Sequence, residues 1–259
     1  MVNVTRVRGI LLDIEGTTTP IDFVHQVLFS YARSHVKTFL QRNWDSAEVV
    51  ADLKDLRKDH EFDVEQSQNP PLLATGSRNA QLDSFIAYIN WLIDRDRKSR
   101  PLKSLQGKIW MQGYRDGTLK SKVFTDVVPA LERWSQAGRT INIFSSGSVL
   151  AQKLLFEHTE SGNLTPFINN YFDTTTGAKA DPDSYRRIAA ALELSPAEIL
   201  FVSDVVGEIE AAHCVGMQTA LCVRPGNEPQ NSADRYQIIH SFAEISLGED
   251  KSGVSSLKN

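Results

Sequence analysis

Short apolar runs alternate along this chain with stretches whose apolar residues recur every three or four positions. A short apolar run that ends in turn residues is typical of a buried parallel strand, whereas the wider spacing is typical of a helix. The runs predict strands at residues 10–12, 140–144, 171–173, 199–202 and 219–223. The wider spacing predicts helices at 127–134, 149–158, 183–192 and 208–215. This alternation predicts an α/β fold with a Rossmann-like parallel sheet and right-handed crossovers.

The segment between the first predicted strand and the others has a different pattern. Apolar residues recur there at helical spacing, most clearly at Leu82–Ile93, and Pro101 is expected to end this helical stretch. Strand signals are scarce in the segment. We therefore expect an inserted α-helical cap domain at residues 23–107, within a core domain formed by residues 1–22 and 108–259.

Composition narrows the class of protein. The chain has 259 residues, of which 41% are hydrophobic and 23% charged, and these values argue against disorder and against a membrane protein. A formal net charge of −4 gives no basic surface for nucleic acid, so a small polar ligand is favoured. Cys214 and Cys222 do not make a disulfide framework and are expected to be reduced core residues. Because Asp13 and Glu15 interrupt the first apolar run too early for a signal peptide, a cytoplasmic location without a membrane partner is expected.

Two carboxylates, Asp13 and Glu15, stand where the first predicted strand ends in a Gly/Thr turn. Open parallel sheets bind ligands beyond the carboxyl ends of their strands, so Asp13 is expected at the floor of a crevice. An acidic residue after a strand is also a common turn former or helix cap. This segment alone therefore leaves both interpretations open.

Other predicted strands bring further polar residues to the same edge of the sheet. Ser145 and Ser146 follow one strand, Lys179 lies in the loop after another, and Asp204 follows a third. Serine and aspartate before a helix often only cap it, and a loop lysine is often only solvated. The same groups suit a phosphate, because hydroxyls and free amides at a helix start accept one and a lysine offsets its charge. Together with Asp13, Asp204 is suited to hold Mg²⁺.

The combination of these groups meets the requirements of phosphoryl transfer: a carboxylate nucleophile, phosphate donors and a carboxylate for a hard metal ion. A receiver-like phosphorylated signalling module combines similar groups on a parallel sheet and is an alternative of another class. Such a module carries its phospho-acceptor on a middle strand and has no large cap. Because Asp13 follows the first strand, the order of the motifs favours an enzyme.

Long strings of residues carry a more specific resemblance. They are LDIEGTTTPI at 12–21, FTDVVPA at 124–130, SSGSV at 145–149 with AQKLLF at 151–156, and VRPGN at 223–227. The order of these motifs resembles that of the haloacid dehalogenase superfamily. Their residue sequences resemble those of its acireductone synthase branch, the enolase-phosphatases of methionine salvage. The general superfamily has aspartate two residues after its nucleophile. Glu15 at that position is similar to the enolase-phosphatase branch in particular.

The resemblance implies a role for each candidate residue. Asp13 would attack phosphorus and form an aspartyl-phosphate, which water would then hydrolyse. One Mg²⁺ per subunit is implied, with Asp13, Glu15 and Asp204 as its ligands. The groups that would hold the phosphate oxygens are Ser145, Ser146 and Lys179. Whether Glu15 binds the metal directly or acts as general acid and base stays open.

The resemblance also implies a substrate and a monomeric state. The substrate is a small phosphorylated diketone, 2,3-diketo-5-methylthiopentyl-1-phosphate, which is enolised and then dephosphorylated to the acireductone 1,2-dihydroxy-3-keto-5-methylthiopentene. The base that removes the C1 proton is left open among His25, His35, Glu15 and residues of the cap. The nearest enzymatic alternative is a generic Mg-dependent phosphomonoester phosphatase of the same superfamily, which would release phosphate without an enol product.

Overall fold

A computed structural model describes residues 2–4, 6–97, 99–229 and 235–248 of the chain. The chain forms two compact units. One, here called the core unit, comprises Met1–Asp22 and Ser121–Asn259, and the other, the helical unit, comprises Phe23–Lys120.

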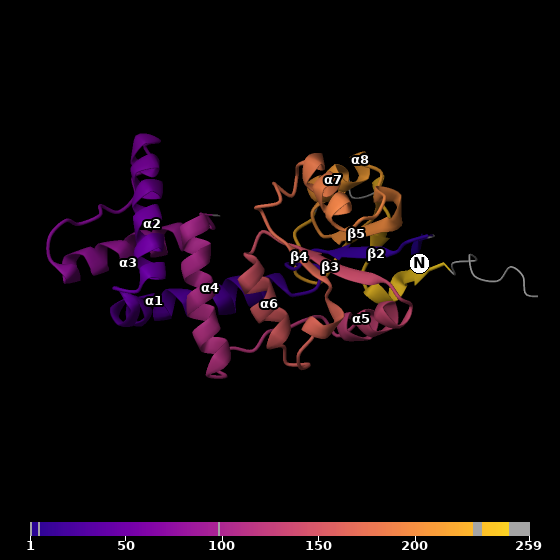
Figure 1. Cartoon of the computed structure of the whole chain (residues 1–259), viewed down its shortest axis with the longest axis horizontal. Coiled ribbons are helices and arrows are strands. Elements are labelled where there is room, and N and C mark those ends of the chain that lie inside the picture. Colours follow the sequence, from indigo (N-terminus) through magenta and orange to yellow (C-terminus); the bar gives the residue numbers. More distant parts are fainter. Residues whose placement is uncertain (1, 5, 98, 230–234, 249–259) are drawn as a thin grey trace, which may run out of the picture. The chain divides into compact units, whose positions relative to one another are not determined.

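A six-stranded sheet is the centre of the core unit (Figure 1). The strand order is β4-β3-β2-β5-β6-β7, and all neighbours are parallel. The strands are β2 (Gly9–Leu12), β3 (Thr140–Phe144), β4 (Asn170–Phe172), β5 (Ile199–Ser203), β6 (Gln218–Cys222) and β7 (Ile238–Ile239). The order reverses at β2, which has β3 on one side and β5 on the other, and open sheets bind ligands at such a switch point. The predicted α/β fold with a Rossmann-like parallel core is confirmed.

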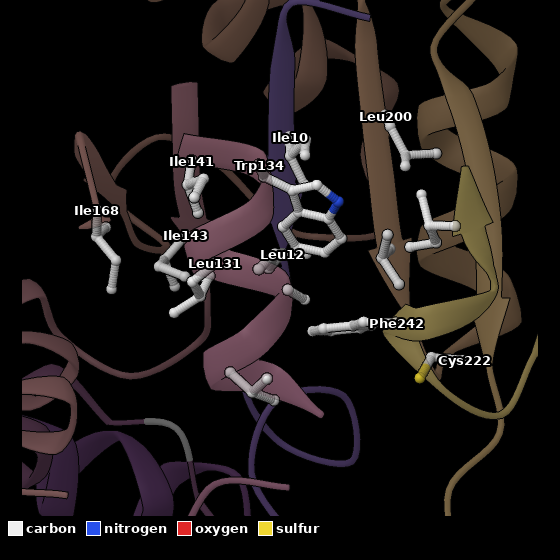
Figure 2. Close-up of a cluster of buried hydrophobic side chains, with 14 of the residues drawn as sticks. Ile10, Leu12, Leu131, Trp134, Ile141, Ile143, Ile168, Leu200, Cys222 and Phe242 are labelled. Carbon is white, nitrogen blue, oxygen red and sulfur yellow. The ribbon is translucent and has the colours of Figure 1, made fainter. Parts of the chain in front are cut away.

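Helices cover both faces of this sheet. They are α5 (Val127–Gln136), α6 (Val149–Glu157), α7 (Pro182–Ala191) and α8 (Val206–Cys214). In Figure 1, α7 and α8 lie on one face and α5 on the other. Ile10 and Leu12 pack in the apolar cluster on the α5 side, with Trp134 at its centre (Figure 2), whereas Leu11 packs with the cluster on the α7 and α8 side. Successive residues of a strand point to opposite faces, so the uninterrupted apolar run of β2 serves both.

Two details of the core unit differ from the sequence-based expectations. A second, two-stranded parallel sheet joins β1 (Val2–Val4) to β8 (Ile245–Leu247), and these strands are too short to give a clear apolar pattern. Cys222 is buried, but Cys214 is exposed at the end of α8. The expectation of a core position was therefore wrong for Cys214.

The helical unit has a core of its own. After a π-helical segment at Phe23–Phe29, its helices are α1 (Ser30–Asn43), α2 (Ala47–Glu65), α3 (Arg78–Asp94) and α4 (Arg100–Arg115). Apolar side chains from all four, among them Leu40, Leu56, Leu92 and Leu105, form one buried cluster. The hydroxyls of Ser46, Ser77 and Ser99 accept backbone N–H bonds at the starts of α2, α3 and α4, which explains where these helices begin.

The C-terminal boundary of the helical unit lies beyond the expected one. Residue 107 is inside α4, and the unit continues to Lys120. Pro101 stands in the first turn of α4, where proline is favoured because that backbone N–H would have no helical partner. Pro101 therefore marks the start of a helix, and the preceding helix already ends at Asp94. Among the described helices, none is long and apolar enough to cross a membrane.

Candidate active site

Asp13 directly extends β2 at the switch point of the sheet. Its backbone N–H donates to the carbonyl of Val202 in β5 at 3.0 Å. The residues that leave β3 and β5 beside it are Ser145 and Asp204. The sheet thus brings three of the predicted site residues to one edge.

A tight turn follows Asp13. The amides of Thr17–Thr19 all donate to the carbonyl of Ile14, at 3.2, 2.9 and 2.9 Å. Gly16 has φ +71°, and a Cβ atom there would lie 2.3 Å from Oδ2 of Asp204. Only glycine combines this backbone conformation with room for the neighbouring carboxylate. The turn therefore packs directly against Asp204, and the Asp13 charge acts on that carboxylate.

A buried lysine bridges two carboxylates at this edge. The Lys179 ammonium lies 2.6 Å from Oδ1 of Asp13 and 2.6 Å from Oε2 of Glu208. Burial alone would lower the pKa of Lys179, but the two carboxylates outweigh it and raise that pKa above its ordinary value. Lys179 is thus a charged partner of Asp13 and not a solvated loop residue.

The start of α7 holds the loop that carries Lys179. The Tyr185 hydroxyl donates to the Lys179 carbonyl, and the Ser184 hydroxyl donates to the Ala178 carbonyl, each at 2.7 Å. Both donors lie in the first turns of α7 and are fully buried. The backbone from which the Lys179 side chain extends is therefore fixed.

Negative charge exceeds positive charge in this cluster. Burial, followed by repulsion from Asp13 and Glu208, raises the pKa of Asp204 to about 7. Burial and Asp13 also raise the pKa of Glu208 to about 7, although Lys179 and a hydrogen bond from Ser203 act in the opposite direction. Lys179 pairs with Asp13 and Glu208, and the carboxylate of Asp204 adds a third negative charge beside them, so the cluster is suited to a further cation.

The turn after β3 leads directly into the start of α6. Ser148, and neither Ser145 nor Ser146, is the N-cap of α6: its hydroxyl accepts from the Ala151 amide. The Ser145 hydroxyl accepts from the Gly147 amide at 3.2 Å. Serine hydroxyls placed just before a capped helix N-terminus offer donors to a phosphate in the favourable direction of the helix dipole.

Gln152 of α6 holds this turn through its side-chain amide. It is 1% exposed, and its side-chain amide donates to the carbonyls of Gly147 and Phe172 at 2.8 Å each. The first carbonyl belongs to the Ser145–Gly147 turn and the second to the end of β4. A single buried side chain therefore couples the Ser145–Gly147 turn to the sheet.

Gln152→Leu is expected to weaken phosphate binding. Leucine has a similar volume but cannot donate. The Gly147 carbonyl then loses the bond from Gln152, and the Phe172 carbonyl keeps only the bond from the Ser145 N–H, at a cost of about 1–3 kcal/mol of folding free energy. We expect the inhibition constant of inorganic phosphate to rise about tenfold, with a smaller change in kcat. Phosphate inhibition and thermal melting measure the two effects. Gln136→Leu, at an exposed position of α5, is the matched control and should change neither; an unchanged inhibition constant in Gln152→Leu would contradict the expectation.

The structure also identifies site residues that sequence reasoning missed. Glu208 lies four residues after Asp204, on the first turn of α8, and its carboxylate accepts from both Lys179 and Ser203. The spacing of four was the available signal, because it puts a second acid in the first turn of the helix that follows Asp204. Capping does not explain Asp204, since the N-cap of α8 is Val205.

The carboxylates of the site can be compared with the ligands that a metal ion needs. In the part of the chain that the structure describes, no group of three or more His, Cys, Asp or Glu side chains forms a ready metal cage. Mg²⁺ commonly binds through only one or two carboxylates, with water and substrate phosphate as its other ligands. Asp13 and Asp204, with the excess negative charge around them, fit such an ion. The share of Glu15 in metal binding stays a prediction.

The fold and the site together define a haloacid dehalogenase-like hydrolase. The model of that family matches residues 7–216. A crystal structure of the UTR4 protein from Saccharomyces cerevisiae is similar, with a TM-score of 0.72, 33% identity, and coverage of 92% of this chain and 99% of that chain.

Curated relatives narrow the family further. An enolase-phosphatase E1 from Synechococcus elongatus is 52% identical over 91% of this chain and 96% of the relative. Another, from Drosophila melanogaster, is 44% identical over 90% of each. The chain belongs to the enolase-phosphatase E1 family and is an enzyme.

Proposed function

We propose that this enzyme enolises 2,3-diketo-5-methylthiopentyl-1-phosphate and then hydrolyses its phosphate to give the acireductone of methionine salvage. The observation that carries the proposal is the buried Asp13 carboxylate, which Lys179 holds at the switch point of the sheet at 2.6 Å. In an enolase-phosphatase family member, this is the geometry expected of a phosphoryl acceptor.

Asp13 is the nucleophile in the phosphoryl-transfer step. Lys179 binds Oδ1, so we assign the attack on phosphorus to Oδ2. The new Oδ2–P bond forms as the bond between phosphorus and the C1 oxygen breaks. The product leaves as an enolate, and its C1 oxygen takes up one proton to give the enol. Water then attacks the aspartyl-phosphate, which releases inorganic phosphate and restores the Asp13 carboxylate.

Lys179 has a second function beside the orientation of Asp13. An ammonium has three N–H donors, and Asp13 and Glu208 occupy two of them. The third donor is available to a phosphate oxygen, together with the hydroxyls and amides of Ser145 and Ser146. Donors placed in advance where charge develops stabilise the transition state.

The excess of carboxylates supports a cation requirement. We propose Asp13, Glu15 and Asp204 as the ligands of one Mg²⁺, which when bound would offset charge on the phosphoryl oxygens. Glu208 remains the partner of Lys179. This division gives each acid at the site a distinct task.

Enolisation needs a base for the C1 proton, which the neighbouring carbonyl acidifies. Of the candidates, Glu15 shares a turn with Asp13, whereas His25 and His35 belong to the helical unit. We propose that the helical unit, inserted between β2 and α5, acts as the cap of the enzyme. A cytoplasmic monomer without a nucleic-acid or membrane partner is part of the same proposal.

The proposal is tested by recording two signals from one reaction. Purified enzyme with Mg²⁺ and the diketone phosphate is expected to give a transient ultraviolet absorbance of the enol, followed by phosphate and a persistent acireductone absorbance. Chelation of the metal is expected to abolish phosphate release, and added Mg²⁺ to restore it. Phosphate without either absorbance would indicate a generic phosphatase, and no turnover would refute the proposal.

A further inference from the structure

Three consecutive backbone carbonyls of the turn that carries Asp13 and Glu15 accept hydrogen bonds from other segments of the chain. The oxygens of Gly16–Thr18 each accept a hydrogen bond from a segment far away in the sequence. The donors are, in order, Nδ2 of Asn227 at 3.0 Å, Nε of Arg224 at 3.2 Å and the backbone N–H of Phe124 at 3.0 Å. Because Thr17 and Thr18 are fully buried, these carbonyls depend on protein donors.

Arg224 is fixed before it reaches the turn. Its side chain is 4% exposed, and Nη1 donates to both oxygens of Asp126 at 3.0 and 2.9 Å and to the His240 carbonyl at 2.9 Å. The guanidinium carbon also lies 4.5 and 4.8 Å from the ring centres of Phe124 and Phe242. A buried guanidinium with a paired carboxylate and two aromatic neighbours has little freedom, so its Nε is directed at one point.

Asn227 acts on the part of the turn that faces Asp204. Its amide also donates to the Cys222 carbonyl at 3.3 Å, which ties it to the end of β6. The Gly16 carbonyl that it holds belongs to the residue packed against the Asp204 carboxylate. A shift of this peptide would therefore change how Asp13 and Asp204 lie relative to each other.

We propose that Arg224, oriented by Asp126, and Asn227 are positioning residues that fix the Asp13–Thr19 turn for phosphoryl transfer. The inference rests on the proposed role of Asp13 as nucleophile. Neither side chain contacts a reacting atom in this assignment. Their effect is on the placement of Asp13 and Glu15, and a displacement on the order of 1 Å is sufficient to slow a reaction about a hundredfold.

Asn227→Leu tests the proposal with the same number of side-chain heavy atoms and no change in charge. Asn43→Leu is the matched control, because Asn43 is also half-buried and also donates its side-chain amide to a backbone carbonyl, that of Phe39 at 2.8 Å. We expect Asn227→Leu to lower kcat about tenfold or more with KM changed less than about twofold. Its melting temperature is expected to fall no further than that of Asn43→Leu, which should keep the wild-type kcat.

Hydrogen exchange provides a measurement that does not depend on activity. In Asn227→Leu, the amides of Thr17–Thr19 are expected to exchange about tenfold faster than in the wild type, with the strands of the sheet unchanged. Arg224→Lys, which keeps the charge but loses the planar fork, is expected to show the same split between kcat and KM.

The outcomes separate the two proposals. If the wild type is active, and Asn227→Leu has the same kcat and the same amide exchange as the wild type, the positioning role alone is overturned. The positioning role is also overturned if the loss of kcat in Asn227→Leu is no larger than the fraction of the variant that is unfolded. An inactive wild type, with faster exchange in Asn227→Leu, would refute the proposed function but support the fixing of the turn.

Discussion

Asp13→Asn is expected to lower phosphate release by on the order of 10⁴-fold or more. An amide oxygen is a far weaker nucleophile than a carboxylate, and loss of a covalent nucleophile removes the whole reaction path. Asparagine keeps the shape of the side chain and can still accept from Lys179. It also removes one source of the repulsion that raises the pKa values of Asp204 and Glu208. The variant is therefore expected to fold normally.

Asp45→Asn is the matched control for this prediction. The substitution makes the same chemical change at Asp45, whose side chain is 78% exposed. Phosphate release by the two variants, with circular dichroism as a check on folding, measures the effect. A folded Asp13→Asn protein that keeps more than about one hundredth of the wild-type kcat would contradict the assignment of the nucleophile.

Lys179→Met is expected to damage both activity and stability. Loss of one preorganised cationic donor lowers kcat by on the order of 10²- to 10³-fold. It also leaves the buried carboxylates of Asp13 and Glu208 without their common partner, at a cost of about 3–5 kcal/mol of folding free energy. Both effects follow from a single ammonium that serves a structural and a chemical task.

A double variant separates these two tasks. Adding Glu208→Gln to Lys179→Met removes one of the unpaired charges, so the melting temperature is expected to recover in part while kcat stays low. Lys58→Met, at a lysine whose side chain is 64% exposed, is the control and should behave as the wild type. Recovery of kcat together with stability would show that Lys179 acts only by holding the fold.

The sequence predicted the main elements of the core because their apolar patterns are long and regular. The four buried residues of β2 and the five of β5 are uninterrupted apolar runs, apart from the terminal Gly9 and Ser203, and this pattern has few alternatives in an α/β chain. The start of α4 was harder to predict. It depends on a serine cap at Ser99 with proline just inside the helix, and Pro101 alone suggests an interruption.

The candidate site was only partly predictable for a similar reason. The positions of Asp13, Ser145 and Asp204 follow from strand ends, which a pattern can reveal. The bridge from Lys179 to Glu208, and the outer bonds from Arg224 and Asn227, join segments that are far apart in the sequence. Such contacts depend on side-chain packing in three dimensions, for which local spacing carries no signal.

The central claim is that the phosphoryl group passes through Asp13. The most direct test is to stop the reaction with borohydride during turnover and to identify the modified residue by peptide mass spectrometry. An aspartyl-phosphate is reduced to homoserine, so the account predicts homoserine at position 13 only in samples that received substrate. Turnover without modification at position 13, or with homoserine at another aspartate, would contradict it.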